Sequence, residues 1–352
     1  MQKVVIALSG GVDSSVAAAL LVDQGYDVVG VTMRLWSEPG CEHENRCCTP
    51  ETRLLAQQLA EKLNIPFHVL DTAEIFREQV VQAFLDGYAN GDTPNPCIFC
   101  NRRIKWGFLL DFARSLGAEW IATGHYGRIV HNDRGIFELW KGVDESKDQS
   151  YFLSLLTQQH LAHTIFPLAE MHKTQVRALA QQRHLPAADQ AESQDLCFLS
   201  GGDYRAFLRK YVPQVAQPGA VVNRAGRVLG EHQGLAFYTI GQRKGLPAAG
   251  RPLYVLYKNL ENNTLLVGYE EELGQQTLHA EEINWIAGEP PLRPLQAQVK
   301  IRYRAVPAPA LVTPQPDGGA QVVFEKPLRD ITPGQMAVFY AGNQVLGGGL
   351  IR

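Results

Sequence analysis

The sequence has 352 residues and a formal net charge of −3, with 45% hydrophobic and 20% charged residues. This length predicts more than one domain, and the near-neutral charge argues against non-specific nucleic-acid binding by bulk charge. We expect a cytoplasmic protein, because no apolar run approaches the ~20 residues of a membrane span and the N-terminus does not resemble a signal peptide. Six cysteines are too few for a disulfide scaffold of this length.

Strand-like and helix-like segments alternate from residue 3 to about residue 125. We predict strands at 3–8, 26–33, 65–71 and 118–126, and helices at 14–24, 51–64, 73–88 and 104–117. This alternation indicates an α/β fold, in which helices cover both faces of a parallel sheet. Ligands of such folds bind at the carboxyl ends of the strands.

The loop after the first predicted strand reads ALSGGVDSS. Gly10 and Gly11 allow a tight turn whose amides approach an anion, nearby serine hydroxyls add donors, and the following helix directs its positive end to the same place. These features favour a phosphate-binding loop over a simple glycine turn. Asp13 is suited to cap the helix or to hold Mg²⁺. The lysine of a P-loop kinase is absent, and SGGVDS resembles the PP-loop motif of enzymes that cleave ATP between its α and β phosphates.

Two cysteines lie three positions apart in the stretch TPNPCIFCNRRIKWG. The pair allows three interpretations, namely half of a zinc site, a redox pair, or a reactive thiolate at Cys100. A helix expected to start just after Cys100 and three neighbouring cations favour the thiolate; these cations are Arg102, Arg103 and Lys105.

A further group of cysteines occurs in the polar stretch GCEHENRCC. Cys41, His43 and Cys47 are interpreted as surface residues or weak metal ligands. Cys48 is expected to be a small buried hydrophobe.

After about residue 200, short alternating runs separated by turn signals dominate. A helix is predicted at 202–212, and strand-like runs occur within 220–232, 251–268, 295–312, 319–340 and 344–351. The segment GEPPLRPL resembles a connector between units. This half predicts one or two small β-barrels or sandwiches, and we place the domain boundaries at 1–203, 204–275 and 276–352.

The order of several motifs resembles one family over nearly the whole chain. These motifs are ALSGGVDSSVAAALL, VTMRLW, TPNPCIFCNRRIKWG, IATGHYGRI, KDQSYFL, ESQDLCFLS, YTIGQRKGL, KIRYRA and ITPGQMAVFY. They resemble the tRNA-specific 2-thiouridylases, the MnmA/TrmU family of the PP-loop superfamily. The resemblance implies a Rossmann-like PP-loop domain of the adenine nucleotide alpha-hydrolase type, a small central domain and a C-terminal β-barrel that contacts tRNA.

The resemblance also implies a sulfurtransferase reaction. ATP, with Mg²⁺, adenylates the C2 oxygen of the wobble uridine in the anticodon stem-loop of tRNAs for Lys, Glu and Gln. Cys197 then carries a persulfide from a cysteine desulfurase or sulfur-relay protein, Cys100 is the nucleophile, and the two form a transient disulfide.

By motif position, the resemblance implies two further sets of residues. The implied ATP-binding residues are Ala7, Leu8, Ser9, Gly10, Gly11, Val12, Asp13, Ser14, Met33 and Gly124. The implied tRNA-binding residues are Asn95, Pro96, Cys97, His125, Lys147, Asp148, Gln149, Arg302, Tyr303 and Gln335.

Several alternatives remain open from the sequence. Many family members have Asp at the position of Cys97, so Cys97, Cys100 and Cys197 together are candidates for an iron–sulfur site, although the persulfide route is preferred. KIRYR, at 300–304, suits either tRNA contact or a charge-protected edge strand. The alternative functions are a PP-loop synthetase or amidotransferase acting on a small molecule, and a zinc-stabilised, non-catalytic RNA-binding protein.

Overall fold

The computed structural model describes residues 1–40, 49–191, 196–199 and 203–352. The interpretations of Cys41, His43, Cys47 and Cys48 concern residues outside these ranges.

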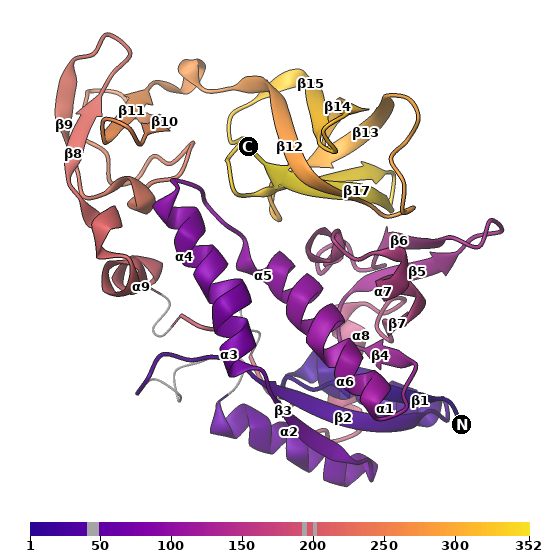
Figure 1. Ribbon diagram of the computed structural model, residues 1–352. Helices are drawn as coiled ribbons and strands as arrows, with labels where there is room; N and C mark the ends of the chain where they lie inside the picture. Colours follow the sequence, from indigo (N-terminus) through magenta and orange to yellow (C-terminus); the bar gives the residue numbers. More distant parts are fainter. Residues whose placement is uncertain (41–48, 192–195, 200–202) are drawn as a thin grey trace.

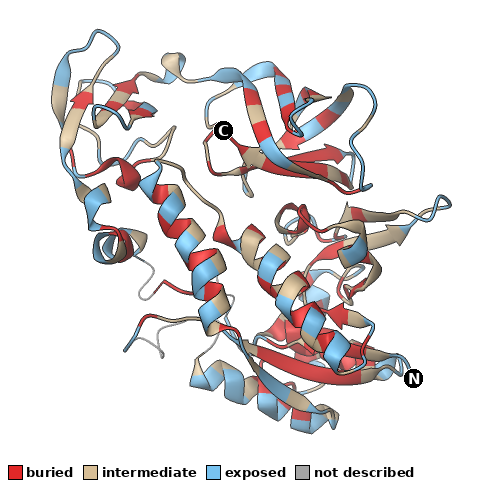
Figure 2. Ribbon diagram, in the orientation of Figure 1, coloured by how far each residue is buried: buried red, intermediate tan, exposed pale blue. Residues whose placement is uncertain are grey.

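A parallel sheet with the strand order β3-β2-β1-β4-β7 forms the first part of the chain (Figure 1). Its strands are β1 (Lys3–Ala7), β2 (Asp27–Arg34), β3 (Phe67–Asp71), β4 (Trp120–Ala122) and β7 (Thr164–Ile165). Most of β2 is buried, as expected for an apolar strand covered on both faces (Figure 2). The order reverses beside β1, because β2 and β3 lie on one side of it and β4 on the other.

Helices pack against this sheet, and their limits follow local capping chemistry. Helix α1 (Val12–Asp23) packs against α2 (Pro50–Leu63) and α8 (Lys173–Gln182). The hydroxyl of Thr49 accepts a hydrogen bond from the amide of Thr52 and caps α2, which has Pro50 in its first turn.

Two longer helices each contain a π-helical segment. The first runs through α3 (Ala73–Phe76), η1 (Arg77–Val81) and α4 (Gln82–Ala89), and the second through α5 (Pro96–Phe99), η2 (Cys100–Leu109) and α6 (Leu110–Ser115). The helix predicted at 104–117 therefore begins earlier, at Pro96, because proline suits the first helical position. Cys97 consequently lies in the first turn, ahead of Cys100.

Residues 127–162, for which no element was predicted, contain a hairpin and two short helices. These elements are β5 (Gly127–His131), β6 (Phe137–Lys141), the 3₁₀ helix η3 (Ser150–Leu153) and α7 (Gln158–Ala162). Strand β6 pairs with β17 (Gln344–Ile351), so the hairpin joins the sheet of the C-terminal barrel.

A small central sheet has the order β10-β11-β8-β9. Its strands are β8 (Gly219–Val222), β9 (Val228–His232), β10 (Tyr254–Asn259) and β11 (Thr264–Gly268). Helix α9 (Tyr204–Tyr211) and the 3₁₀ turns η5 (Pro213–Ala216), η6 (Leu235–Phe237) and η7 (Glu270–Glu272) flank them.

The C-terminal strands close into a barrel. Strands β12, β15, β14, β13, β16 and β17 pair in this order, and β12 pairs again with β17. Their bounds are β12 (Gln275–Trp285), β13 (Leu295–Lys300), β14 (Ala308–Pro314), β15 (Ala320–Leu328) and β16 (Met336–Ala341). The predicted fold class, an α/β domain followed by a central domain and a β-barrel, is confirmed.

Two details of the second half differ from prediction. The segment GEPPLRPL connects β12 to β13, two strands of the same barrel, and is not a connector between units. The edge-strand interpretation of KIRYR is wrong, because β13 ends at Lys300 and residues 301–304 form a bend and a turn. Within the described ranges, no helix has the length and apolarity needed to cross a membrane.

Candidate active site

The glycine loop lies at the carboxyl end of β1, where the strand order reverses. The hydroxyls of Ser14 and Ser15 donate to the carbonyl oxygen of Gly11 at 3.1 and 2.9 Å, and the amide of Ser9 donates to Ser14 Oγ at 3.2 Å. Gly10 has φ +72°, and a Cβ there would come within 2.3 Å of a backbone oxygen of α2. The loop is therefore held by its own hydroxyls and specifically requires glycine at position 10.

Gly124 connects the neighbouring strand β4 to this loop. A Cβ on Gly124 would lie 2.8 Å from both the backbone carbon of Asp13 and the amide nitrogen of Ser14. The structure thus brings Gly124 against the first turn of α1, beside the glycine loop. Met33 is partly buried near the end of the adjacent strand β2. Such reversals of strand order are where α/β sheets bind ligands.

A lysine absent from the loop sequence reaches the loop from another helix. Lys173, at the start of α8, places Nζ 2.6 and 2.7 Å from the carboxylate oxygens of Asp13, and its side chain is only 8% exposed. The Tyr126 hydroxyl donates to the same carboxylate at 2.8 Å. Asp13 does not cap α1, because Gly11 occupies the N-cap position without a side-chain cap. Sequence reasoning missed Lys173, since 160 residues separate it from Asp13.

His125 follows Gly124 and lies among aromatic rings. Its Nδ1 is 2.7 Å from Thr123 Oγ1, and its Nε2 is 3.3 Å from Lys105 Nζ. Burial, assisted by the charge of Lys105, holds the pKa of His125 well below its ordinary value of 6.5.

The loop that precedes the Cys97–Cys100 helix is held by the barrel. The amide of Thr93 donates to the carbonyl oxygen of Pro333 at 2.9 Å, and Gln335 Nε2 donates to the carbonyl oxygen of Thr93 at 2.6 Å. Asn95 is the N-cap residue of α5 but makes no side-chain cap hydrogen bond. Gln335, implied as a tRNA contact, therefore positions the proline loop in this structure.

Cys100 and Cys197 are partly buried and pack against the same apolar core, whereas Cys97 is exposed. Five rings of this core are named here the phenylalanine cluster: Phe76, Phe84, Phe198, Phe207 and Phe237. The ring of Phe198, next to Cys197, lies 5.2 Å from the ring of Phe84 and 5.7 Å from that of Phe207. Tertiary packing thus brings together two segments whose cysteines are 97 positions apart (197 − 100).

The three cations near Cys100 diverge to different partners. Arg103 donates to the carbonyl oxygen of Gln79 at 3.0 Å and lies over the ring of Phe99 at 5.2 Å. Lys105 turns to His125. Burial, together with the charge of Arg102, lowers the pKa of His160. These three residues are therefore close in sequence, but they do not form a single cationic cluster.

Lys147, Asp148 and Gln149 follow the β5–β6 hairpin. The Gln149 amide donates to the carbonyl oxygen of Tyr126 at 2.8 Å, and Gln149 Oε1 accepts from the Tyr126 amide at 3.0 Å. Asp148 is buried, and this burial raises its pKa. The segment is thereby joined through Tyr126 to Asp13 of the glycine loop.

Arg302 and Tyr303 lie just after β13. Arg302 donates to the carbonyl oxygen of Ile240 at 3.1 Å and to Thr332 Oγ1. Tyr303 packs on Phe152 with ring centroids 4.4 Å apart. Arg302 therefore links the central unit to the barrel.

The residues described do not include a group of three or more His, Cys, Asp or Glu arranged to hold a metal ion. Cys97, Cys100 and Cys197 thus do not form the ligand set of an iron–sulfur cluster or structural zinc site in this conformation. Mg²⁺ needs fewer protein ligands, since one or two carboxylates together with nucleotide phosphates are sufficient to bind it. Asp13 beside the glycine loop has the ligand chemistry for such an ion, but Lys173 and Tyr126 hold its carboxylate in this structure and would have to release it.

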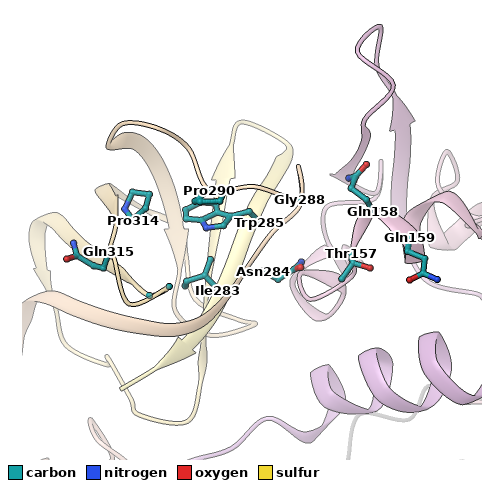
Figure 3. A pocket seen from close by; sticks show the side chains of 12 residues that line it. Thr157, Gln158, Gln159, Ile283, Asn284, Trp285, Gly288, Pro290, Pro314 and Gln315 are labelled. Carbon is teal, nitrogen blue, oxygen red and sulfur yellow. The ribbon is translucent and has the colours of Figure 1, made fainter.

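A cavity of about 650 Å³ lies between the start of α7 and the barrel (Figure 3). Trp285, Pro290 and Gln158 contribute to its wall. None of the predicted site residues lines it.

Comparisons with known proteins agree with this architecture. The model for the tRNA methyl transferase HUP domain matches residues 2–201, the tRNA methyl transferase PRC-barrel domain 205–269, and the aminomethyltransferase beta-barrel domain 275–351. The fold and glycine loop define a PP-loop α/β protein with two β modules.

Full-length relatives specify the family. The chain is 49% identical to tRNA-specific 2-thiouridylase MnmA of Magnetococcus marinus, over 99% of each chain. It is 47% identical to the protein of the same name from Chloroflexus aggregans, over 100% of this chain and 98% of that one. The chain therefore belongs to the tRNA-specific 2-thiouridylase family. A 4-thiouridine synthetase–RNA complex with bound ATP aligns over 60% of this chain and 51% of that chain, at 17% identity and a TM-score of 0.38, too weakly to carry an argument.

Proposed function

We propose that this protein is a tRNA-uridine 2-sulfurtransferase that uses ATP to replace the C2 oxygen of the wobble uridine in tRNAs for Lys, Glu and Gln with sulfur. The observation that carries the proposal is the combination of a glycine loop at the strand reversal with two cysteines on one apolar cluster. A small-molecule synthetase would have no use for this cysteine arrangement. Thiols and an ATP loop also fit thiolation better than methyl transfer.

The glycine loop is assigned to ATP. The amides of residues 9–14 and the positive end of α1 bind phosphate oxygens, and Gly124 and Met33 lie beside the nucleotide. Asp13 would hold Mg²⁺, which neutralises phosphate charge when bound. Lys173 then moves from Asp13 to the β and γ phosphates, and so takes the role of the lysine that the loop lacks. Uridine O2 attacks the α-phosphate, and pyrophosphate leaves.

The cysteines are assigned to sulfur transfer. The terminal sulfur of a persulfide on Cys197 attacks C2, the C2–O bond breaks, and AMP leaves with its electron pair. The Cys100 thiolate attacks Cys197 Sγ, so a disulfide forms while the sulfur stays on C2. A thiol reductant reopens the disulfide, and a cysteine desulfurase or sulfur-relay protein recharges Cys197.

The remaining implied residues are assigned to tRNA. Asn95, Pro96 and Cys97 face the target base, which must leave its stack to react. Lys147–Gln149, Arg302 and Tyr303 contact the anticodon stem-loop, with Arg302 exchanging its protein partners for phosphate. Gln335, implied as a tRNA contact, acts on tRNA through the proline loop that it positions. We assign nucleotide chemistry to residues 1–203, linkage to 204–275 and tRNA contact to 276–352.

The test uses purified protein, ATP, unmodified tRNA and a persulfide donor, with nucleosides analysed by mass spectrometry. Wild-type protein is expected to form 2-thiouridine and AMP. Cys100→Ser and Cys197→Ser should lose at least about 1,000-fold in 2-thiouridine formation but still adenylate tRNA, because loss of a covalent nucleophile abolishes only its own step. Cys97→Ser is compared with them and should lose less thiolation, because Cys97 is assigned to base contact and not to sulfur transfer. Full thiolation by either variant would overturn the proposal.

A further inference from the structure

The contact between Lys105 and His125 determines the protonation of the imidazole. A lysine ammonium only donates hydrogen bonds, so Nε2 of His125 must accept at the 3.3 Å contact. The proton of the neutral ring is therefore on Nδ1, which donates to Thr123 Oγ1 at 2.7 Å. The lowered pKa of His125 agrees with this neutral form. Both ring nitrogens are thus engaged by protein, and neither is available to hydrogen-bond tRNA while Lys105 stays in place.

The surroundings of His125 fix this arrangement. The rings of Trp106 and Phe166 lie 5.7 and 6.3 Å from the imidazole. Thr123 is buried, and Lys105 is partly buried. The imidazole that contacts the ammonium is consequently held in place by packed neighbours.

The position of the Lys105 ammonium connects the helix that bears Cys100 with the strand end beside the glycine loop. Lys105 comes from η2, the helical segment that starts at Cys100. Its partner His125 is the residue after Gly124, which packs on the first turn of α1 beside the glycine loop. A cation from the helix that carries the thiol therefore reaches the end of β4 where the nucleotide loop lies.

The π-helical winding contributes to this placement. In an α-helix of 3.6 residues per turn, residues five apart lie about 140° from each other around the axis. The i to i+5 bonding of a π-helix instead brings residue i+5 above residue i. Lys105, five positions after Cys100, is therefore turned toward the side of the helix that bears the thiol.

We infer that Lys105 stabilises the negative charge on the α-phosphate while ATP and then the uridine adenylate react, and that His125 is a positioning residue that holds Lys105 there. This inference rests on the proposed function. When uridine O2 attacks, an O–P bond forms and the bond to pyrophosphate breaks. When sulfur attacks C2, the C2–O bond breaks and AMP leaves. Negative charge on the α-phosphate must be stabilised in both steps, and Lys105 acts by charge while keeping its proton. Lys173, once released from Asp13, serves the outer phosphates.

The test measures single-turnover adenylation of tRNA without a sulfur donor, together with the ATP Kd and the Tm of each variant. Lys105→Met is expected to slow adenylation about 100-fold, because removing one donor that stabilises transition-state charge has an effect of this size in other enzymes. The ATP Kd should change less than about threefold. Lys105→Arg should recover part of the rate. Lys62→Met is the matched control, because exposed Lys62 bonds only to the carbonyl oxygen of His184 among the contacts described.

A double-mutant cycle tests the role of His125. His125→Ala should slow adenylation about tenfold in the wild-type background and less than about twofold in the Lys105→Met background, because it acts through Lys105. Equal factors in both backgrounds, or a Lys105→Met variant of wild-type rate, would overturn the inference. Absence of 2-thiouridine with the wild-type protein and persulfide would instead overturn the proposed function itself.

Discussion

The nucleotide end and the thiol end of the site are built by different means. At the nucleotide end, residues 9–15 hydrogen-bond mainly to one another, and glycines give the backbone its required shape. At the thiol end, Cys100 and Cys197 come from distant segments that meet through the phenylalanine cluster. The first end depends on local backbone chemistry and the second on tertiary packing. The two ends should therefore be separable by substitution.

Among substitutions that leave the reacting cysteines in place, the largest effect is expected from Phe198→Ala at the thiol end. Truncating a buried phenylalanine typically costs about 3–5 kcal/mol, and here it would release the segment that holds Cys197. Thiolation should fall at least about 100-fold while adenylation is largely retained, as measured by 2-thiouridine and AMP formation in parallel. Phe324→Ala in the barrel is the control for a similar core truncation elsewhere. Equal loss of both reactions in Phe198→Ala would contradict the separation.

Gly124→Ala is the opposite case, because it should damage the nucleotide end and not the thiol end. Its Cβ would lie 2.8 Å from backbone atoms of Asp13 and Ser14, so the start of α1 must shift. Overpacking of this kind costs about 1–3 kcal/mol, and we expect the ATP Kd to rise about 10- to 100-fold. In Gly107→Ala the new Cβ would meet only Arg102 O at 3.8 Å, so ATP affinity should be unchanged. Calorimetric titration with ATP measures both.

The neutral His125 predicts a pH dependence at the junction of the two ends. Its pKa is lowered in the folded protein, so below the unfolded value of 6.5 the unfolded chain binds a proton that the folded chain does not. The contribution of neutral His125 to the free energy of unfolding is therefore complete above pH 6.5. It is lost as pH falls below 6.5, by at most about 1.4 kcal/mol per pH unit. His125→Gln should show a smaller fall in Tm between pH 7.5 and 5.5. An identical fall would mean that His125 is protonated in the folded state.

The smallest effect is expected where the barrel holds the proline loop. Gln335→Met removes the hydrogen bond to the carbonyl oxygen of Thr93, at a cost of about 0.5–1.5 kcal/mol. Thiolation should fall about three- to tenfold with the ATP Kd unchanged. Gln276→Met removes a similar bond, to the carbonyl oxygen of Phe324 inside the barrel, and should leave thiolation intact. Equal effects of the two would show that the barrel does not set the loop position.

Local sequence was informative where local chemistry decides structure. The glycine loop, the parallel sheet and the turn-separated strands of the second half follow from residue type and period, and the structure has them. Pro96 also carries a local signal for a helix start, although the prediction began that helix at residue 104. The β5–β6 hairpin is a local feature that the prediction missed, since its two strands pair with each other at five positions. Only the pairing of β6 with β17, about 200 residues later, could not be read from the local pattern.

By itself, then, the sequence determined the fold class, the phosphate-binding loop and the family resemblance, because these depend on short motifs and on the backbone they permit. Only the tertiary structure decided which side chains meet. It paired Lys173 with Asp13, directed Lys105 to His125 rather than leaving three cations around Cys100, and set both cysteines against one cluster. The physical reason is that charges and rings far apart in the chain become neighbours only when the apolar cores pack.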